Sequence, residues 1–220
     1  ISKTMSFDPS IEIIILKLNK TKKIDNILHI GACLGEEISF YQRLNPKKIY
    51  WFEPNPKLLS KLNENVSGQS FESLVFPYAV SNKKGKAEFN IIEDTNKTNP
   101  GCSSLHNLKI HAELYQDITK VDTCTVETIN IDEFLNEKNL ETKFDLVSLD
   151  TQGHDFEILS SSKIIFNAKA IVIETAEVEL YEGQKTDVEI DSYLESKGYY
   201  KNYYHKFHHV WGDSLYLKKD

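Results

Sequence analysis

One stretch near the start of the chain restricts the fold more than any other. Residues 27–30 (Ile-Leu-His-Ile) are mostly apolar and lead directly into Gly31 and Gly35, and an amphipathic segment follows as far as Leu44. This pattern is typical of a buried parallel strand, a tight glycine turn and a helix. Glycine lets the backbone turn sharply and lets a ligand approach closely. The helix that follows directs free N–H groups toward that ligand, so the stretch predicts a binding site.

A second apolar segment strengthens this interpretation. Residues 48–52 end on Glu53, at the distance of about 20 residues from the glycine turn where an acidic residue binds the ribose of a nucleotide cofactor. A carboxylate can accept hydrogen bonds from both ribose hydroxyls. The combination predicts an adenosine-containing cofactor. The alternative is that Glu53 only caps a helix that begins at Asn55.

Length, charge and cysteine content exclude several classes of protein. A chain of 220 residues with 40% hydrophobic residues can form one sizeable α/β domain, and no apolar run approaches the length of a membrane span. The net charge of −7 and the single arginine, Arg43, argue against nucleic acid as a partner. Cys33, Cys102 and Cys124 form no CxxC pair, which indicates reduced cysteines and a cytoplasmic location.

The rest of the chain alternates between strand and helix patterns. We expect a helical leader in 1–26, followed by a single domain in 27–220, and the start at Ile1 rather than Met suggests one domain of a longer protein. Predicted strands are 74–80, 87–92, 121–128, 144–149, 170–173, 199–204 and 214–217, and predicted helices are 55–66, 131–140, the segment after Asp155, and 187–197. This alternation predicts a mostly parallel, doubly wound α/β sheet. The polar stretch 93–104 is either a lid over the site or a mobile insertion.

Polar residues follow the predicted strands at their carboxyl ends, where ligands bind in such sheets. These ends carry residues 31–35, Glu53, 79–81, 150–154 and Glu174. Any one of the acidic residues could be a helix cap. Together they predict one site at a common edge of the sheet.

Motifs along most of the chain resemble a known family. They are HIGACLG at 29–35, FEPNP at 52–56, AVSNKKG at 79–85, SSL at 103–105, SLDTQGHDFEIL at 148–159, IET at 173–175, ELYEG at 179–183 and WGDSLYL at 211–217. In order and spacing, from about residue 24 to the end, the chain resembles the FkbM family of S-adenosylmethionine-dependent methyltransferases. It is similar in particular to members that O-methylate sugars in bacterial and viral surface glycans. The resemblance implies a Rossmann-like class I methyltransferase fold with an antiparallel C-terminal strand.

The resemblance also implies roles for individual residues. Cofactor-binding residues would be Gly31, Ala32, Cys33 and Gly35 at the methionine end, Glu53 at the ribose, followed by Pro54 and Asn55, and Tyr78, Ala79 and Val80 beside the adenine. Asp150 and Gln152, which would also bind the cofactor, would face the methyl group and the acceptor together with His154. One departure is His29, where the family usually has an acidic residue. For this position we favour a core histidine that is hydrogen-bonded to the backbone.

The chemistry of methyl transfer suggests what the catalytic residues must do. The sulfonium of the cofactor is already an activated electrophile. A sugar hydroxyl is a poor nucleophile, so a positioned base assists it. Asp150 and His154 are the candidates for this catalytic role. The alternatives are that Asp150 only binds the cofactor and that His154 is an ordinary residue of the first helical turn.

Residues for the acceptor are chosen because they lie in loops or at strand ends. The candidates are Ser103, Ser104, His111, Glu174, Tyr181 and Trp211, which offer hydrogen bonds and aromatic surface for a sugar. Trp211 could equally be structural.

Two further patterns carry little weight. Tyr181 and Lys185 have the YxxxK spacing of short-chain dehydrogenases, but Gly183 between them indicates a loop rather than the helix that this pair needs. His205, His208 and His209 have a loose spacing, so no metal site is expected.

We therefore predict an S-adenosylmethionine-dependent O-methyltransferase that acts on a sugar hydroxyl of a glycan and releases S-adenosyl-L-homocysteine. The alternatives are methylation of another small hydroxyl or amine, a catalytically silent glycan- or partner-binding domain, and a nicotinamide-dependent oxidoreductase. The expected partner is a glycan or glycosyl acceptor, without nucleic acid or a membrane span, and fusion to glycosyltransferase domains is one expected arrangement.

Overall fold

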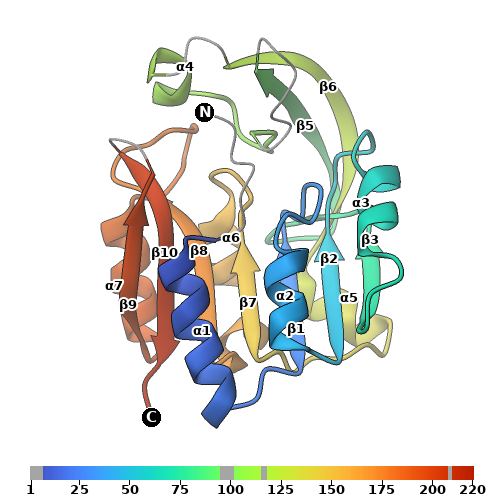
Figure 1. Cartoon of the computed structure of the whole chain (residues 1–220). Coiled ribbons are helices and arrows are strands. Elements are labelled where there is room, and N and C mark those ends of the chain that lie inside the picture. Colours follow the sequence, from blue (N-terminus) through green and yellow to red (C-terminus); the bar gives the residue numbers. More distant parts are fainter. Residues whose placement is uncertain (1–6, 95–101, 115–117, 208–209) are drawn as a thin grey trace.

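A seven-stranded sheet forms the centre of the chain in the computed structural model, which describes residues 7–94, 102–114, 118–207 and 210–220 (Figure 1). Its strands are β1 (Asn26–Ile30), β2 (Lys48–Phe52), β3 (Glu72–Phe76), β7 (Leu146–Leu149), β8 (Ala170–Ala176), β9 (Tyr199–Lys206) and β10 (Trp211–Lys218). Their order in space is β3-β2-β1-β7-β8-β10-β9, and only β10 runs antiparallel to its neighbours. This confirms the predicted mostly parallel, Rossmann-like sheet with an antiparallel C-terminal strand.

The sheet is buried on both faces, as a parallel sheet covered by helices requires. Successive residues of a strand point to opposite faces. Leu28 and Ile30 of β1 therefore belong to one core cluster, while Ile27 belongs to the other. The same alternation separates Tyr50 from Trp51 in β2. Apolar runs in the sequence thus become strands with two buried sides.

Helices cover both faces of this sheet. On one face lie α1 (Pro9–Thr21), α2 (Ile38–Leu44) and α3 (Leu59–Val66), and on the other α5 (Ile131–Glu137), α6 (Asp155–Ser161), α7 (Asp187–Ser196) and a short 3₁₀ helix, η1 (Ile164–Asn167). Figure 1 shows α1 and α2 in front of the sheet. The helix expected within 1–26 begins at Pro9, and the Asp8 carboxylate before it accepts a hydrogen bond from Ser10 N at 2.8 Å.

A second, smaller sheet lies beyond the carboxyl ends of the central strands (Figure 1). It consists of β4 (Ala79–Val80), β6 (Ile118–Ile129) and β5 (Gly85–Asp94) in that order, and the short helix α4 (Ile110–Leu114) lies nearby in the chain between β5 and β6. The sequence predicted one strand over 74–80, and this is wrong. Pro77 has no backbone N–H to donate, so the strand ends at Phe76 and the chain resumes as β4 in the other sheet.

Two helix boundaries also differ from the prediction. The helix expected from Asn55 begins at Leu59, because residues 55–58 form a turn in which Leu58 N donates to Asn55 O at 3.0 Å. The helix expected over 131–140 ends at Glu137. Most of the predicted lid stretch, 93–104, lies outside the described residues.

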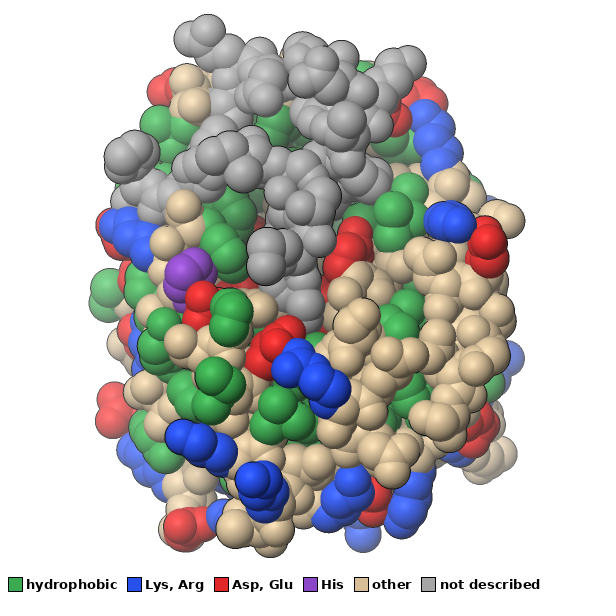
Figure 2. All heavy atoms as spheres, in the orientation of Figure 1, with side chains coloured by type: hydrophobic (Ala, Val, Ile, Leu, Met, Phe, Trp, Pro, Cys, Tyr) green, Lys and Arg blue, Asp and Glu red, His purple; other side chains and the backbone are tan. Residues whose placement is uncertain are grey.

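Charged side chains are mixed on the face shown in Figure 2. Lysines lie mostly on its lower half and are interleaved with acidic and neutral groups, so the described residues form no continuous basic surface there. Within the described ranges, no helix is both long and apolar enough to cross a bilayer.

Candidate active site

The glycine turn after β1 is held against two neighbouring strands. The backbone N–H groups of Gly31 and Ala32 both donate to Phe52 O, at 2.9 and 3.0 Å. Gly31 has a φ of +84°, and a Cβ at this position would lie 1.9 Å from the carbonyl oxygen of Asp150. Only glycine can therefore occupy this point, where the turn meets the end of β7.

Glu53 connects the turn to the end of β2. Its side chain is only 5% exposed, its Oε2 accepts a hydrogen bond from Cys33 N at 2.8 Å, and its Oε1 accepts one from Asn55 N at 2.7 Å. Glu53 thus does more than cap the segment that begins with Pro54 and Asn55. A carboxylate has about four lone-pair directions, so ribose hydroxyls can still bind to it.

Acidic side chains are concentrated around this turn. Burial, and to a lesser degree the neighbouring Glu36 and Asp150, raise the pKa of Glu53 to about 7. Burial raises the pKa of Glu36 as well, and the pKa of the Cys33 thiol is raised by burial and by these carboxylates. Such surroundings favour a cationic ligand over a phosphate. S-adenosylmethionine, with its sulfonium and ammonium groups, fits them better than a nicotinamide dinucleotide does.

The residues assigned to the adenine lie on and beside β4. Ala79 and Val80 are buried, and the ring of Tyr78 packs against Phe134 with centroids 5.2 Å apart. Ser81 follows, and its N–H donates to Ile129 O at 2.8 Å. They face the same edge of the sheet as the glycine turn.

Gln152 joins two carboxylates at the end of β7. Its Nε2 donates to Asp150 Oδ1 at 2.6 Å and to Glu174 Oε1 at 3.1 Å. Its Oε1 accepts from the Tyr181 hydroxyl at 2.6 Å, and its carbonyl oxygen accepts from Ser104 Oγ at 2.7 Å. The predicted site residues Asp150, Gln152 and Glu174 are therefore in direct contact.

Tyr181 and Ser104 differ in position from the other acceptor candidates. Tyr181 is fully buried and Ser104 is 1% exposed, so both lie behind Gln152 rather than on a surface open to a sugar. Ser103 and Trp211 are half-buried, with Ser103 Oγ accepting from Ile92 N at 3.1 Å and Trp211 at the start of β10. His111 belongs to α4, and its side chain lies outside the described part of the structure.

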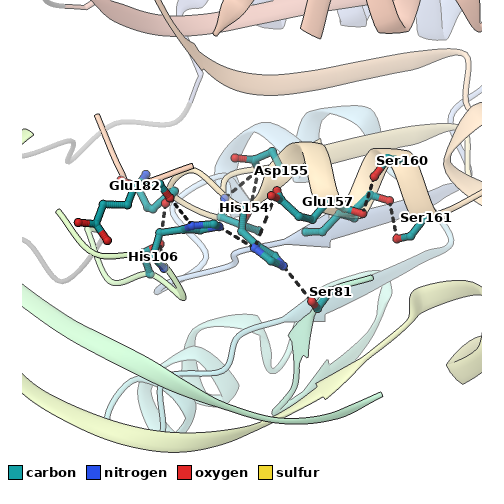
Figure 3. A network of polar contacts seen from close by, with 12 residues as sticks. Ser81, His106, His154, Asp155, Glu157, Ser160, Ser161 and Glu182 are labelled. Carbon is teal, nitrogen blue, oxygen red and sulfur yellow. Dashed lines mark hydrogen bonds and ion pairs between the residues drawn. The ribbon is translucent and has the colours of Figure 1, made fainter. Parts of the chain in front are cut away.

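His154 lies in a chain of side chains rather than facing an open space (Figure 3). Its Nε2 is 2.9 Å from Ser81 Oγ, and its Nδ1 is 2.8 Å from Nε2 of His106. Burial, together with the neighbouring His106, lowers the pKa of His154 to about 4. The ring is therefore neutral near pH 7, and both of its nitrogens contact other side chains. Because neither nitrogen is open to a substrate, Asp150 is favoured over His154 as the base.

Three residues that sequence reasoning did not select belong to this site. His106 contacts His154, Glu36 accepts a hydrogen bond from Leu34 N at 3.2 Å within the glycine turn, and Asp155 accepts from Thr151 N and Oγ1 at 3.0 and 2.8 Å. Burial raises the pKa of Asp155 to about 7. Asp155 directly follows the DTQGH motif, so the sequence could have indicated this residue. His106 lies in an irregular segment, which gave no such indication.

Other histidines have structural contacts. His29 is buried in the core as expected, and its Nδ1 contacts the Tyr41 hydroxyl at 2.9 Å. His205 Nδ1 lies 3.0 Å from Asp8 Oδ2, while His208 and His209 are outside the described residues.

Solved structures with the same fold are methyltransferases. Precorrin-6y C5,15-methyltransferase from Geobacter metallireducens GS-15 is similar with a TM-score of 0.51 and 13% identity, covering 99% of this chain and 93% of that chain. Ribosomal protein L11 methylase from Lactobacillus delbrueckii subsp. bulgaricus has a TM-score of 0.50 and 9% identity, covering 96% and 78%. The strand order thus defines the Rossmann-like fold of class I methyltransferases.

The family follows from the sequence match. Residues 29–200 match the methyltransferase FkbM domain, so the chain belongs to this family of S-adenosylmethionine-dependent methyltransferases. The chain is also 28% identical, over 162 residues, to the 2-O-methyltransferase NoeI of Sinorhizobium fredii (strain NBRC 101917 / NGR234). That match covers 72% of this chain and 66% of NoeI, slightly less than two thirds of its length.

Proposed function

We propose that this domain transfers the methyl group of S-adenosylmethionine to a hydroxyl of a sugar within a glycan. The observation that carries the proposal is the group formed by Asp150, Gln152 and Glu174, in which one amide nitrogen contacts two carboxylates at 2.6 and 3.1 Å. Paired carboxylates can accept hydrogen bonds from neighbouring sugar hydroxyls. The name of NoeI, a 2-O-methyltransferase, supports oxygen as the acceptor atom.

Each residue has a distinct task in this scheme. The bound cofactor supplies a methyl group on a sulfonium. Glu53 would hold the ribose of the cofactor. Asp150 accepts the proton of the acceptor hydroxyl, since His154 is neutral and engaged at both ring nitrogens. Tyr181 and Ser104 position Gln152, which holds Asp150 in place.

The first experiment separates the cofactor from the acceptor. Calorimetric titration with S-adenosyl-L-homocysteine, with NAD as the control, should give micromolar binding of the former alone. Binding of NAD, or of neither compound, would contradict the cofactor assignment. Binding of S-adenosyl-L-homocysteine without turnover on any hydroxyl acceptor would indicate a catalytically silent domain.

The second experiment tests the base. The variant Asp150→Asn keeps an oxygen for Gln152, so its affinity for S-adenosyl-L-homocysteine should stay within about threefold while kcat falls by about 10²–10⁴. Asp122→Asn, on an exposed position of β6, is the matched control and should change neither. Equal losses of cofactor affinity and of kcat in Asp150→Asn would refute the assignment of the base.

Partners and location follow as parts of the same proposal. We infer a glycan or glycosyl acceptor as the partner and glycosyltransferase domains as neighbours in a longer chain. None of Cys33, Cys102 and Cys124 forms a disulfide, which is compatible with a reducing, cytoplasmic location.

A further inference from the structure

We propose that His106, His154 and Glu157 bind a divalent transition-metal ion of the Zn²⁺ type. Nε2 of His106 lies 2.8 Å from Nδ1 of His154, and Oε2 of Glu157 lies 3.9 Å from the same Nδ1. One ligand atom from each residue falls within 4.8 Å of the other two. Figure 3 shows the two rings and the carboxylate pointing toward one another.

The far side of each ring supports this assignment. A histidine that binds a metal usually donates its other ring N–H to a carbonyl, a carboxylate or another polar group, which fixes its tautomer. Nδ1 of His106 donates to the carbonyl oxygen of Glu182 at 2.6 Å, which leaves the lone pair of Nε2 directed at the cluster. Nε2 of His154 can donate to Ser81 Oγ at 2.9 Å, which leaves the lone pair of Nδ1 directed at the same point.

Glu157 provides an independent observation. Its Oε2 is buried and accepts no hydrogen bond from any described residue. A buried carboxylate oxygen without a donor is unfavourable. A cation between Glu157 and the two imidazoles would satisfy all three groups at once.

The ligand set indicates the type of metal. Two imidazoles and one carboxylate, with a fourth position left for water or another ligand, are typical of zinc. At Zn–N distances of about 2.1 Å, a tetrahedral site separates two nitrogens by about 3.4 Å. The two ring nitrogens would therefore move apart by about 0.6 Å, which is a small adjustment for two side chains.

The site would connect two parts of the chain on either side of Gln152, one in contact with it and one that follows it in sequence. His106 follows Ser104, whose hydroxyl donates to the Gln152 carbonyl, and Glu157 belongs to α6, which begins three residues after Gln152. A metal here would therefore fix the segment 104–106 against α6. The inference concerns these side chains only and does not depend on the identity of the acceptor.

Metal titration of the purified chain, stripped beforehand with a chelator, tests this inference. Co²⁺ should give saturable visible absorption bands of a four- or five-coordinate ion at one equivalent, and Zn²⁺ should displace it. Zn²⁺ should also raise the thermal midpoint, because a ligand that binds only the folded state stabilises that state. His106→Gln and Glu157→Gln should each weaken binding at least tenfold.

The matched control is His205→Gln, on β9 in contact with Asp8, which should bind Co²⁺ as the wild type does. Two results would overturn the proposal: no binding tighter than about 1 mM, or binding that survives both His106→Gln and Glu157→Gln. Two variants are used so that misfolding of one leaves a test. Titration with S-adenosyl-L-homocysteine is a separate measurement, so failure here is distinguishable from failure of the proposed function.

Discussion

The Glu53 carboxylate accepts a hydrogen bond from the backbone N–H of Cys33 at 2.8 Å, although the two residues are 20 positions apart in the chain. The group assigned to the ribose and the turn assigned to the methionine end of the cofactor are therefore one connected unit. A change at Glu53 should disturb both ends of the cofactor.

Glu53→Gln should raise the Kd for S-adenosyl-L-homocysteine about 10- to 100-fold, the range expected for lost hydrogen bonds to a charged group. A glutamine has one acceptor oxygen, so its NH₂ group must face the N–H of either Cys33 or Asn55. Calorimetry measures the effect. Glu72→Gln, an exposed position on β3, is the control and should bind normally. An unchanged Kd in Glu53→Gln would show that the ribose binds elsewhere.

Asp155 should make stability depend on pH. Its pKa rises from 3.8 to about 7 on folding, so between these values the unfolded chain has lost a proton that the folded chain retains. The free energy of unfolding of the wild type should fall, relative to Asp155→Asn, as the pH rises from about 4 to about 7, and then level off. Three pKa units correspond to an upper bound of about 4 kcal/mol. Urea unfolding at several pH values measures this, and a difference that stays constant or grows in the opposite direction would contradict it.

Gly31→Ala should disrupt both folding and cofactor binding, because its Cβ would lie 1.9 Å from the Asp150 carbonyl oxygen. Gly68→Ala is a matched control, since Gly68 also has a positive φ, of +71°, but nothing lies within 4 Å of its Cβ position. The control should lose only about 1–2 kcal/mol from backbone strain. Thermal unfolding and calorimetry compare the two variants, and equal effects would mean that the close approach to Asp150 is unimportant.

Tyr181→Phe removes the hydroxyl that donates to Gln152 Oε1 at 2.6 Å. It should lower stability by about 1–3 kcal/mol and, because Gln152 holds Asp150, also lower kcat. Tyr199→Phe is the control, because the Tyr199 hydroxyl donates to a carbonyl, Ala168 O, at the same distance of 2.6 Å but far from the site in the fold. It should lose similar stability and keep kcat. Equal kinetic losses in both would remove the positioning role of Tyr181.

Local patterns in the sequence were sufficient to predict the main strands of the central sheet. The apolar runs that became β1, β2, β7 and β8 are each followed by polar or glycine residues, so their direction and the edge carrying the site could be predicted. The break at Pro77 was visible in the sequence as well. It was missed because the run of apolar residues around it suggested one continuous strand.

Contacts between residues far apart in the chain could not be predicted from such local patterns. His106 and His154 are 48 positions apart and meet only because the segment after β5 returns to the end of β7. Tyr181 was predicted as a surface for a sugar, since aromatic residues in loops often serve this purpose. Its burial behind Gln152 depends on how the segment after β8 folds back, which no periodic pattern in the sequence indicates.

The pairing of β1 with β7 also bears on how this protein can form. Asp25 N donates to Asp145 Oδ2 across a separation of 120 positions, and Gly31 packs on Asp150. Closing so long a loop is slow and entropically unfavourable. During synthesis from the N-terminus, the glycine turn can take its final shape only after β7 has left the ribosome. Competence to bind the cofactor is therefore acquired late in the synthesis of this domain, only after the end of β7 has been translated.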